Sequence, residues 1–270
     1  CGFDPTADSL HIGHLVPIIT LMRFQKYGNR PVAIIGGGTG LIGDPSGKTA
    51  ERSMNTKETV ALWSKCFEKQ IGHFLKFDGQ TSFCVNNYDW FSELKAIDMW
   101  RDYGKYFNIN IMMQKDSVKS RLESGGLTYL EFSYMIMQSI DFLKVYQDPK
   151  IKCEIQIGGQ DQWGNLTAGL DLIRKVEGPE AKAYALTMPL ILKSDGTKYG
   201  KTESGAVWLD KEKTTPYEFY QFFINVADAD VMQLLKYYTF LSHEEINALE
   251  KSLREKPELR EAQKTLAWEM

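Results

Sequence analysis

A short apolar run that ends in glycine constrains the fold of this chain more than any other feature. Residues 31–36 read PVAIIG, and Gly36 opens a glycine-rich loop that extends to Gly43. A strand that is apolar on both faces is typical of a parallel sheet covered by helices on both sides. The sequence therefore predicts a buried parallel strand that leads into a flexible loop at the edge of a sheet.

The surrounding segments alternate between helix and strand patterns. Leu15, Ile18, Ile19 and Met22 have the spacing of one apolar helix face, and Gly28 ends that helix. We expect further strands at 83–85 and 153–157, helices over most of 92–150 and over 163–175, strands and loops at 184–210, and helices from 216 onward. This alternation predicts an α/β fold with a doubly wound, mainly parallel sheet, followed by a small α-helical domain.

The composition is that of an ordinary globular protein, with 43% apolar and 25% charged residues and a net charge of −3. No apolar run reaches the roughly 20 residues that span a bilayer, so we expect no membrane contact. The four cysteines are scattered without a CxxC pair, which argues against a disulfide framework or a zinc site. Because the basic excess of most nucleic-acid-binding proteins is missing, any RNA contact should be local or lie outside this sequence.

Three polar, glycine-bearing segments each follow a predicted strand or turn, at residues 1–14, 36–48 and 156–165. Ligands of open α/β sheets bind beyond the carboxyl ends of the strands. We therefore expect these segments to meet at one pocket.

Two histidines lie three residues apart where the first helix begins. This spacing places His11 and His14 on one helix face, beside the free N–H groups of a helix start, which suit phosphate. The alternative is that they cap the helix or pair with Asp4 and Asp8. A metal site is not expected, because no third ligand accompanies the pair.

A second signal is the sequence KYGKT at 198–202. Two lysines around a glycine form a flexible cationic clamp that could neutralise a leaving polyphosphate. The alternative is a solvated basic loop.

Together these two signals resemble the signature motifs of the class I aminoacyl-tRNA synthetases, His-x-Gly-His and Lys-x-x-Lys-Ser/Thr. Five longer stretches resemble the bacterial tyrosyl-tRNA synthetases of that class, over nearly the whole chain. They are CGFDPTADSLHIGH (1–14), GLIGDPSGK (40–48), EFSYMIMQSIDF (131–142), QIGGQDQWGN (156–165) and DGTKYGKTESGAVWLD (195–210).

The resemblance implies a Rossmann-like catalytic domain at 1–188, with a helical insertion at about 90–150. A mobile KYGKT loop region at 189–212 and a truncated α-helical domain at 213–270 would follow, with the C-terminal RNA-binding module of the family absent. Cys1 at the start, and a helical pattern without a stop signal at 259–270, also indicate a fragment.

The family activates tyrosine with ATP, releases pyrophosphate, and transfers the tyrosine to tRNA(Tyr). The attacking carboxylate is already a nucleophile at neutral pH, so the enzyme needs positioning and electrostatic stabilisation, not a general base. The resemblance assigns catalytic contacts, mainly to phosphate, to Thr6, His11, His14, Lys48, Arg52, Lys198, Lys201 and Thr202. It assigns ATP binding to Cys1, Gly2, Asp4, Gly13, Gly158, Asp161 and Gln162.

Tyrosine binding is assigned by the resemblance to Thr39, Asp44, Asn87, Tyr134, Gln138, Asp141 and Gln156. Tyr134, Gln138 and Asp141 have the spacing i, i+4, i+7, so one helix face presents all three. In the family, the residue that matches Asp141 accepts a hydrogen bond from the substrate phenol. A carboxylate on an otherwise apolar helix is hard to explain by packing alone, since an unpaired buried charge is costly.

The resemblance further implies a homodimer, with the segment Leu127–Phe132 near its interface. It also implies a cytoplasmic location, with a mitochondrial enzyme of bacterial type as the alternative. Magnesium is expected to arrive with the polyphosphate, without a dedicated protein cage.

Three alternatives stay open. A nucleotidyltransferase, such as a cytidylyltransferase or pantothenate synthetase, shares the His-x-Gly-His turn. A tryptophanyl-tRNA synthetase shares the fold and the motif order. A synthetase-like protein that serves only as an RNA-binding or splicing factor would not need its phosphate-binding groups.

Overall fold

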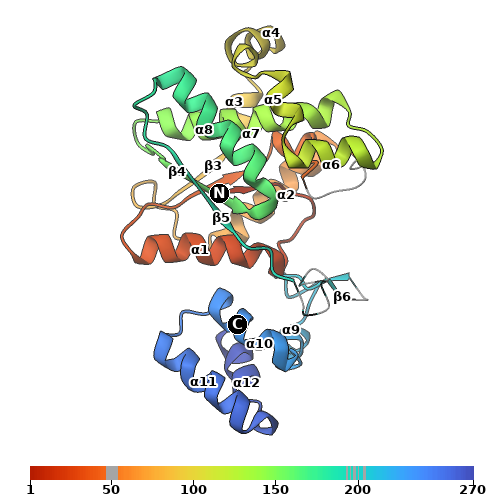
Figure 1. The fold of residues 1–270 in the computed structure, drawn as a ribbon, viewed down its shortest axis with the longest axis vertical. Coiled ribbons are helices and arrows are strands. Elements are labelled where there is room, and N and C mark those ends of the chain that lie inside the picture. Colours follow the sequence, from red (N-terminus) through yellow and green to blue (C-terminus); the bar gives the residue numbers. More distant parts are fainter. Residues whose placement is uncertain (47–53, 193, 195, 197–198, 200, 203–204) are drawn as a thin grey trace. The chain divides into compact units, whose positions relative to one another are not determined.

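The structure is a computed structural model that describes all residues except 47–53, 193, 195, 197, 198, 200, 203 and 204. The chain forms two compact units (Figure 1). Unit 1 comprises Cys1–Asp8 and Leu21–Leu190, and unit 2 comprises Ser9–Thr20 and Ile191–Met270. Among the described residues, no helix is long and apolar enough to cross a membrane.

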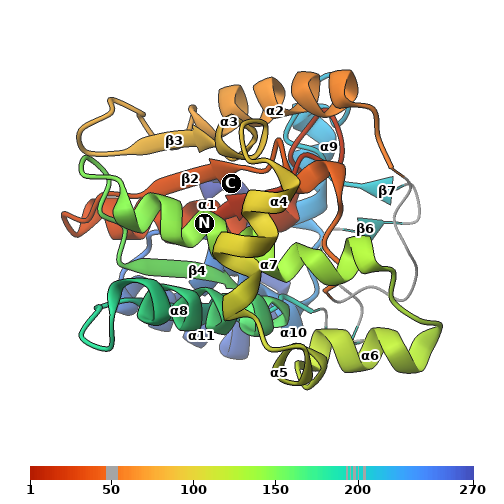
Figure 2. The same ribbon diagram turned by 90° about the horizontal axis from the view of Figure 1, so that it is seen from above.

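Parallel strands organise unit 1. β1 (Gly2–Phe3), β2 (Val32–Ile35) and β3 (Phe83–Asn86) form one sheet in the order β1-β2-β3, and β4 (Ile155–Gly159) pairs with β5 (Tyr184–Met188). All of these pairings are parallel, and β2 and β3 run alongside each other in Figure 2. All four residues of β2 are buried, as the apolar run predicts. The α/β fold class is confirmed, whereas β1 lies where no strand was expected.

The helices of unit 1 fall into a helix between β2 and β3, a helical segment between β3 and β4, and a helix between β4 and β5. They are α2 (Lys57–Ile71), α3 (Tyr88–Phe91), α4 (Ala96–Asp98), α5 (Ile109–Met113), α6 (Asp116–Ser124), α7 (Tyr129–Gln147) and α8 (Trp163–Glu177). Between α4 and α5 the chain makes a π-helical turn at Met99–Tyr103 and a 3₁₀ turn at Gly104–Tyr106. No expectation covered α2, although Val60, Ser64, Phe67 and Ile71 form its buried stripe.

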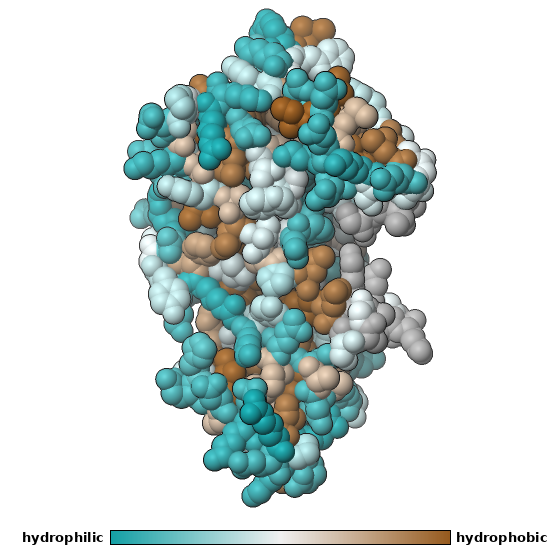
Figure 3. Space-filling model, in the orientation of Figure 1, coloured by the Kyte–Doolittle hydropathy of each residue, from teal (hydrophilic) through white to brown (hydrophobic). Residues whose placement is uncertain are grey.

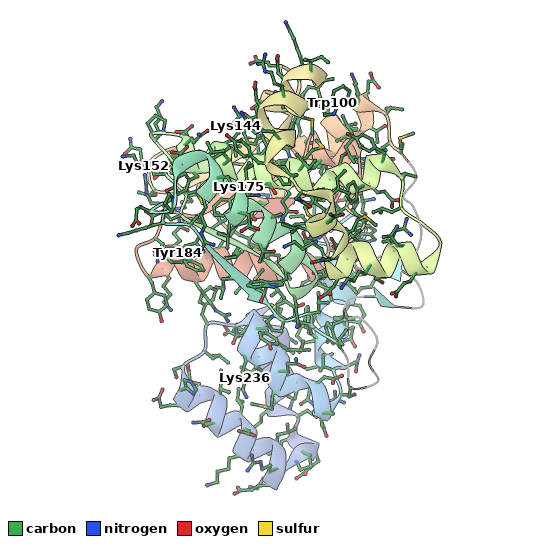
Figure 4. All side chains as sticks on the ribbon, turned by 45° about the horizontal axis from the view of Figure 1, so that its top comes forward. Trp100, Lys144, Lys152, Lys175, Tyr184 and Lys236 are labelled. Atoms are coloured by element: carbon green, nitrogen blue, oxygen red, sulfur yellow. The ribbon has the colours of Figure 1, made fainter. Side chains whose placement is uncertain are left out.

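Helix α7 is fixed at both its start and its flank. Thr128 and Glu131 form a capping box at its first turn, and Glu131 also accepts from Arg121 of α6 at 2.8 Å, with both side chains buried. Its apolar residues share one core with α8. On α8 lies Lys175, which is labelled in Figure 4. Its ammonium donates to the Tyr106 carbonyl at 2.6 Å. The backbone of α7 therefore offers a firm base for the polar residues that it carries.

Unit 2 combines a helical bundle with the segment Ser9–Thr20. Its helices are α9 (Pro216–Ile224), α10 (Asp228–Tyr238), α11 (His243–Glu255) and α12 (Glu261–Glu269), with a 3₁₀ turn at Pro257–Leu259. A short antiparallel pair, β6 (Lys201–Thr202) with β7 (Gly205–Ala206), precedes them. Helix α1 (Leu15–Lys26) begins in unit 2 and ends in unit 1. The domain boundaries expected from the sequence stay a prediction.

Backbone hydrogen bonds explain why Ser9–Thr20 groups with the C-terminal part of the chain. The Ile12 amide donates to the Val207 carbonyl at 3.0 Å, and the Leu209 amide donates to the Leu10 carbonyl at 2.8 Å. The buried Tyr238 hydroxyl of α10 donates to the Ile12 carbonyl at 3.2 Å. The turn with the two histidines is therefore held by segments some 200 residues away in sequence.

Candidate active site

Three strand ends of unit 1 meet in one chain of hydrogen bonds. Asp4 follows β1, Thr39 follows β2, and Asn87 follows β3. The Thr39 hydroxyl donates to Asp4 at 2.7 Å and accepts from the Asn87 amide at 2.9 Å. From α7, the Tyr134 hydroxyl donates to the other oxygen of Asp4 at 2.7 Å. Residues assigned to ATP and to tyrosine thus form one network at the carboxyl edge of the sheet.

Glycine at position 36 is required by this network. A Cβ atom there would collide with the Asp4 carboxylate and with the Thr39 hydroxyl. The glycine that ends the apolar run therefore makes room for the first acidic side chain of the site.

Asp141 lies buried at the end of the same chain of hydrogen bonds, with 5% of its surface exposed. One carboxylate oxygen accepts from the Asn87 amide and the other from the Trp90 indole N–H, each at 2.9 Å. The Asn87 oxygen in turn accepts from the Gly38 amide at 2.7 Å, which fixes the direction of the Asn87 side chain. Two oriented donors therefore hold Asp141, while a carboxylate can accept about four hydrogen bonds.

Burial dominates the electrostatics of this pocket. It raises the pKa of Asp141 from 3.8 to about 7, although the hydrogen bonds from Asn87 and Trp90 oppose the shift. Burial, followed by the charge of Asp4, also raises the pKa of Tyr134 well above its ordinary value of 10.0. Tyr134 is therefore a neutral donor to Asp4, and Asp141 lacks full compensation for its charge.

A second polar cluster joins the glycine-rich loop to the start of α8. The Gln162 amide donates to Asp44 at 2.6 Å, and Asn165 donates to the Gln162 oxygen at 3.1 Å. The Ser46 amide donates to the other oxygen of Asp44 at 2.9 Å. Within unit 1, the predicted meeting of residues 36–46 with residues 156–165 is therefore present.

Two glutamines complete the set assigned to tyrosine in unit 1. Gln156 of β4 is 7% exposed, and its side-chain oxygen is buried with no hydrogen-bond partner among the described residues. An unpaired buried acceptor calls for a donor, such as a ligand group or water. Gln138 lies one turn after Tyr134 on α7 and is half-buried.

A 3₁₀ turn of unit 2, Ile12–His14, carries the two histidines: His11 is its N-cap residue and His14 its last residue. The His11 Nδ1 accepts from the Gly13 amide at 3.0 Å, and the His14 Nδ1 accepts from the His11 amide at 3.1 Å. Their ring centroids lie 4.1 Å apart. Capping, the plainer alternative for these residues, is therefore present, and it uses the Nδ1 atom of each ring.

This capping determines what each ring can offer a ligand. Because both Nδ1 atoms accept, each neutral ring carries its proton on Nε2 and presents an N–H donor there. Desolvation, followed by the charge of His11, lowers the pKa of His14 to about 3, so His14 is neutral at pH 7. At Gly13, a Cβ atom would lie 2.8 Å from the His11 ring, so the space at this glycine belongs to His11 itself.

The remaining predicted residues divide into those that the structure places and those outside its description. Cys1 and Gly2 lie at the start of the first sheet, and Thr6 is exposed after β1. Gly158 lies near the end of β4, and Asp161 lies in the turn Gln160–Gln162 that follows. Lys48, Arg52 and Lys198 lie outside the described residues, and for Lys201 and Thr202 only the backbone in β6 is described.

Sequence reasoning missed Trp90 and Asn165. Both have a signal in the spacing, since each lies three residues after a predicted site residue, Asn87 or Gln162, where a helix begins. Positions i and i+3 share a helix face.

The raised pKa of Asp141 predicts a pH-dependent stability. The folded protein keeps a proton that the unfolded chain releases at a pKa of 3.8, so this stabilisation is complete below about pH 4 and lost as the pH rises through about 7. Relative to an Asp141→Asn variant, which lacks this titration, the free energy of unfolding should fall across that window by at most about 4 kcal/mol. Urea unfolding at a series of pH values measures this free energy for both proteins. The same pH dependence in the two proteins would contradict the raised pKa of Asp141.

Known proteins resemble the chain in sequence and in fold. It is 61% identical to the tyrosine–tRNA ligase of Geobacillus stearothermophilus and 60% identical to tyrosine–tRNA ligase 1 of Bacillus cereus, over 100% of this chain and 64% of each relative. The chain thus spans 64% of the length of these relatives. Among solved structures, the C-terminally truncated mitochondrial tyrosyl-tRNA synthetase of Coccidioides posadasii is 33% identical, with a TM-score of 0.80 over 99% of this chain and 77% of that one.

The fold extends to more distant proteins. A tryptophanyl-tRNA synthetase of Encephalitozoon cuniculi, at 16% identity, has a TM-score of 0.69 over 99% of this chain and 74% of that one. The family model described as tRNA synthetases class I (W and Y) matches residues 1–270. The chain therefore belongs to the class I tRNA synthetases of the tryptophan and tyrosine group.

Proposed function

We propose that this chain is the catalytic part of a tyrosine–tRNA ligase. It activates tyrosine with ATP to give tyrosyl-adenylate and pyrophosphate, and it then transfers the tyrosine to the 3′ end of tRNA(Tyr). The observation that carries this proposal is the buried Asp141 carboxylate, which two oriented donors hold without filling its capacity to accept. The identity of 61% to a bacterial tyrosine–tRNA ligase supports the same substrate.

Asp141 selects tyrosine through its phenol. A phenol O–H is a donor that completes the hydrogen bonding of a buried carboxylate, and phenylalanine has no such group. Because Asn87 and Trp90 orient the carboxylate, the acceptor direction is set before the substrate arrives. The tyrosine phenol also restores part of the compensation that burial removes from Asp141.

The α-ammonium of tyrosine is bound by acceptors of unit 1. The Tyr134 proton is directed to Asp4, so the Tyr134 oxygen can only accept from a third group, as an ammonium requires. Asp44 supplies a negative charge, and Gln138 and Gln156 supply amide oxygens. Thr39 and Asn87 position the acidic groups and belong to the tyrosine set through those contacts.

The phosphates of ATP are bound by neutral and cationic donors. His11 and His14 offer Nε2–H groups, and a neutral donor stabilises growing negative charge without a change of protonation. By resemblance, Thr6 shares the γ-phosphate with His11, and Lys48, Arg52, Lys198, Lys201 and Thr202 clamp the pyrophosphate. The ribose is contacted by Cys1, His14 and Asp161, and the α-phosphate by Gln162. The rest of the nucleotide is lined by Gly2, Asp4, Gly13 and Gly158.

Magnesium accompanies the ATP in this proposal. It prefers oxygen ligands and keeps several waters, so phosphate oxygens can hold it with few protein groups. No group of three His, Cys, Asp or Glu side chains suited to a metal occurs among the described residues. The ion therefore supplies charge neutralisation on the polyphosphate, while positioning rests on the side chains of the chain itself.

The alternatives predict different substrates. A tryptophan substrate would bring an indole N–H to Asp141 in place of a phenol, so a direct comparison of tyrosine with tryptophan distinguishes these two enzymes. A nucleotidyltransferase has no use for the Tyr134, Gln138 and Asp141 face of α7. A purely RNA-binding role would leave the network of unit 1 without a ligand. We propose the cytoplasm as the location, on the resemblance to bacterial enzymes.

Tyrosine-dependent exchange of labelled pyrophosphate into ATP tests the proposal. We expect the Asp141→Ala variant to lose about 10- to 100-fold in kcat/KM for tyrosine, because a charge-assisted hydrogen bond is removed, with little change in the KM for ATP. Asp171→Ala, an exposed site on α8, is the matched control. Exchange driven by tryptophan, or no amino-acid-dependent exchange in the unaltered protein, would refute the function. Equal losses for tyrosine and ATP would refute the role of Asp141.

A homodimer is the second part of the proposal, through the start of α7 and the exposed face of α5 and α6. Apolar side chains in brown gather over α5 and α6 in Figure 3. The exposed members of this surface are Ile109, Ile111, Met113, Leu122 and Tyr129, the last with 69% of its surface exposed. Exposed apolar side chains that gather on neighbouring elements are typical of a protein interface. This surface includes the segment Leu127–Phe132 that the resemblance indicates.

A charge in this surface should dissociate the dimer. We expect Tyr129→Asp to convert a dimer into monomers at micromolar concentration, because an unpaired charge at an interface core is costly. Sedimentation velocity measures the change. Tyr217→Asp, at an equally exposed tyrosine of α9, should leave the dimer intact. A monomeric unaltered protein, or a Tyr129→Asp dimer, would contradict this surface.

A further inference from the structure

Asn165 contacts the residue that joins the two predicted substrate sets. It lies in the first turn of α8 with 3% of its surface exposed. Its side-chain nitrogen donates to the Gln162 oxygen at 3.1 Å and to the Ser46 hydroxyl at 3.4 Å. Gln162 then donates from its own nitrogen to Asp44 at 2.6 Å. Asn165 therefore acts on Asp44 through one intervening amide.

The direction of these bonds is fixed by chemistry. A glutamine side chain has an acceptor end and a donor end, and it can satisfy a given pair of neighbours in only one of its two flipped orientations. Because Asn165 presents an N–H, the Gln162 oxygen faces Asn165 and its nitrogen faces Asp44. In the opposite orientation, the Gln162 oxygen would face the Asp44 carboxylate and repel it.

We infer that Asn165 is a positioning residue that locks the amide of Gln162 with its donor end toward the substrates. This inference rests on the proposed function, in which Asp44 receives the ammonium of tyrosine and Gln162 lies at the α-phosphate. One N–H of Gln162 donates to Asp44, and the amide carries a second N–H for an oxygen of the reacting carboxylate or phosphate. Asn165 itself touches neither substrate.

The orientation that Asn165 imposes places an N–H of Gln162 at the boundary between the proposed tyrosine and ATP sites. A donor aimed there stabilises negative charge during attack on phosphorus, whereas an amide free to flip would present a carbonyl oxygen part of the time. The helix start contributes to the precision, because positions i and i+3 of one turn hold Gln162 and Asn165 side by side. Burial of Asn165 keeps competing water away from the bond.

The isosteric variant Asn165→Asp tests the lock, because a carboxylate accepts where the amide donated. The flipped Gln162 would then turn its oxygen to Asp44. In pyrophosphate exchange we expect the KM for tyrosine to rise about 10- to 100-fold, with the KM for ATP nearly unchanged. Asn247→Asp, an exposed site on α11, is the matched control for the added charge.

A pH profile separates the lock from a general loss of structure. A protonated carboxyl can donate to Gln162 again, so the defect of Asn165→Asp should shrink as the pH falls. The variant Asn165→Ala, which can neither donate nor accept, should show a smaller rise that does not depend on pH. Equal increases in both KM values, a defect of Asn165→Asp that is independent of pH, or an Asn165→Ala variant with unchanged KM would overturn the inference.

A readout without activity distinguishes failure of the lock from failure of the proposed function. Nuclear magnetic resonance of the Gln162 side-chain amide in the ligand-free protein should show hydrogen exchange slowed by the bond to Asp44. Asn165→Ala should speed that exchange at least several-fold, and an unchanged rate would overturn the lock even in an active enzyme. Slow exchange in a protein without tyrosine-dependent activity would instead refute the proposed function alone.

Discussion

The hydrogen bonds that Asn87 and Trp90 donate to the buried Asp141 carboxylate are the interaction on which the rest of the site depends. Taking a carboxylate out of water is costly unless donors replace the lost hydration. Two donors replace it only in part, since the pKa of Asp141 still rises to about 7. A pocket of this kind is incomplete without a further donor, which is the physical basis for reading it as a binding site.

The network around Asp141 shows how a parallel sheet assembles a site from distant segments. Asn87, Thr39 and Asp4 follow three neighbouring strands, so the pairing order β1-β2-β3 brings their side chains into one chain of hydrogen bonds. Tyr134 closes that chain from α7, whose backbone is fixed by its capping box and by the Arg121–Glu131 ion pair. Asp4 and Asp141 are thereby oriented by neutral donors, of which Thr39 and Asn87 belong to the sheet edge and Tyr134 and Trp90 to helices.

Much of this arrangement could be predicted from the sequence, and the exceptions have physical causes. The PVAIIG run predicted β2, and the spacing of Tyr134, Gln138 and Asp141 predicted one face of α7. The two-residue strand β1 could not be predicted, because its ladder depends on long-range pairing with β2 and not on a local pattern. The spacing of Trp90 from Asn87 places it beside the site, but that spacing does not show that its N–H meets a carboxylate more than fifty residues away.

The grouping of Ser9–Thr20 with the C-terminal part has a similar cause. Bonds such as that between Ile12 and Val207 join segments that share no local pattern. The histidine spacing did predict adjacent rings, but the use of both Nδ1 atoms for capping appears only in three dimensions. That detail matters, because it fixes the proton of each neutral ring on Nε2.

A crystal structure with a non-hydrolysable tyrosyl-adenylate analogue tests the central claim most directly. The account predicts that the phenol oxygen of the analogue lies within about 2.6–3.2 Å of an Asp141 carboxylate oxygen, while Asn87 and Trp90 keep their bonds to it. A phenol that binds elsewhere, with Asp141 still buried and bonded only to its two protein donors, would contradict it.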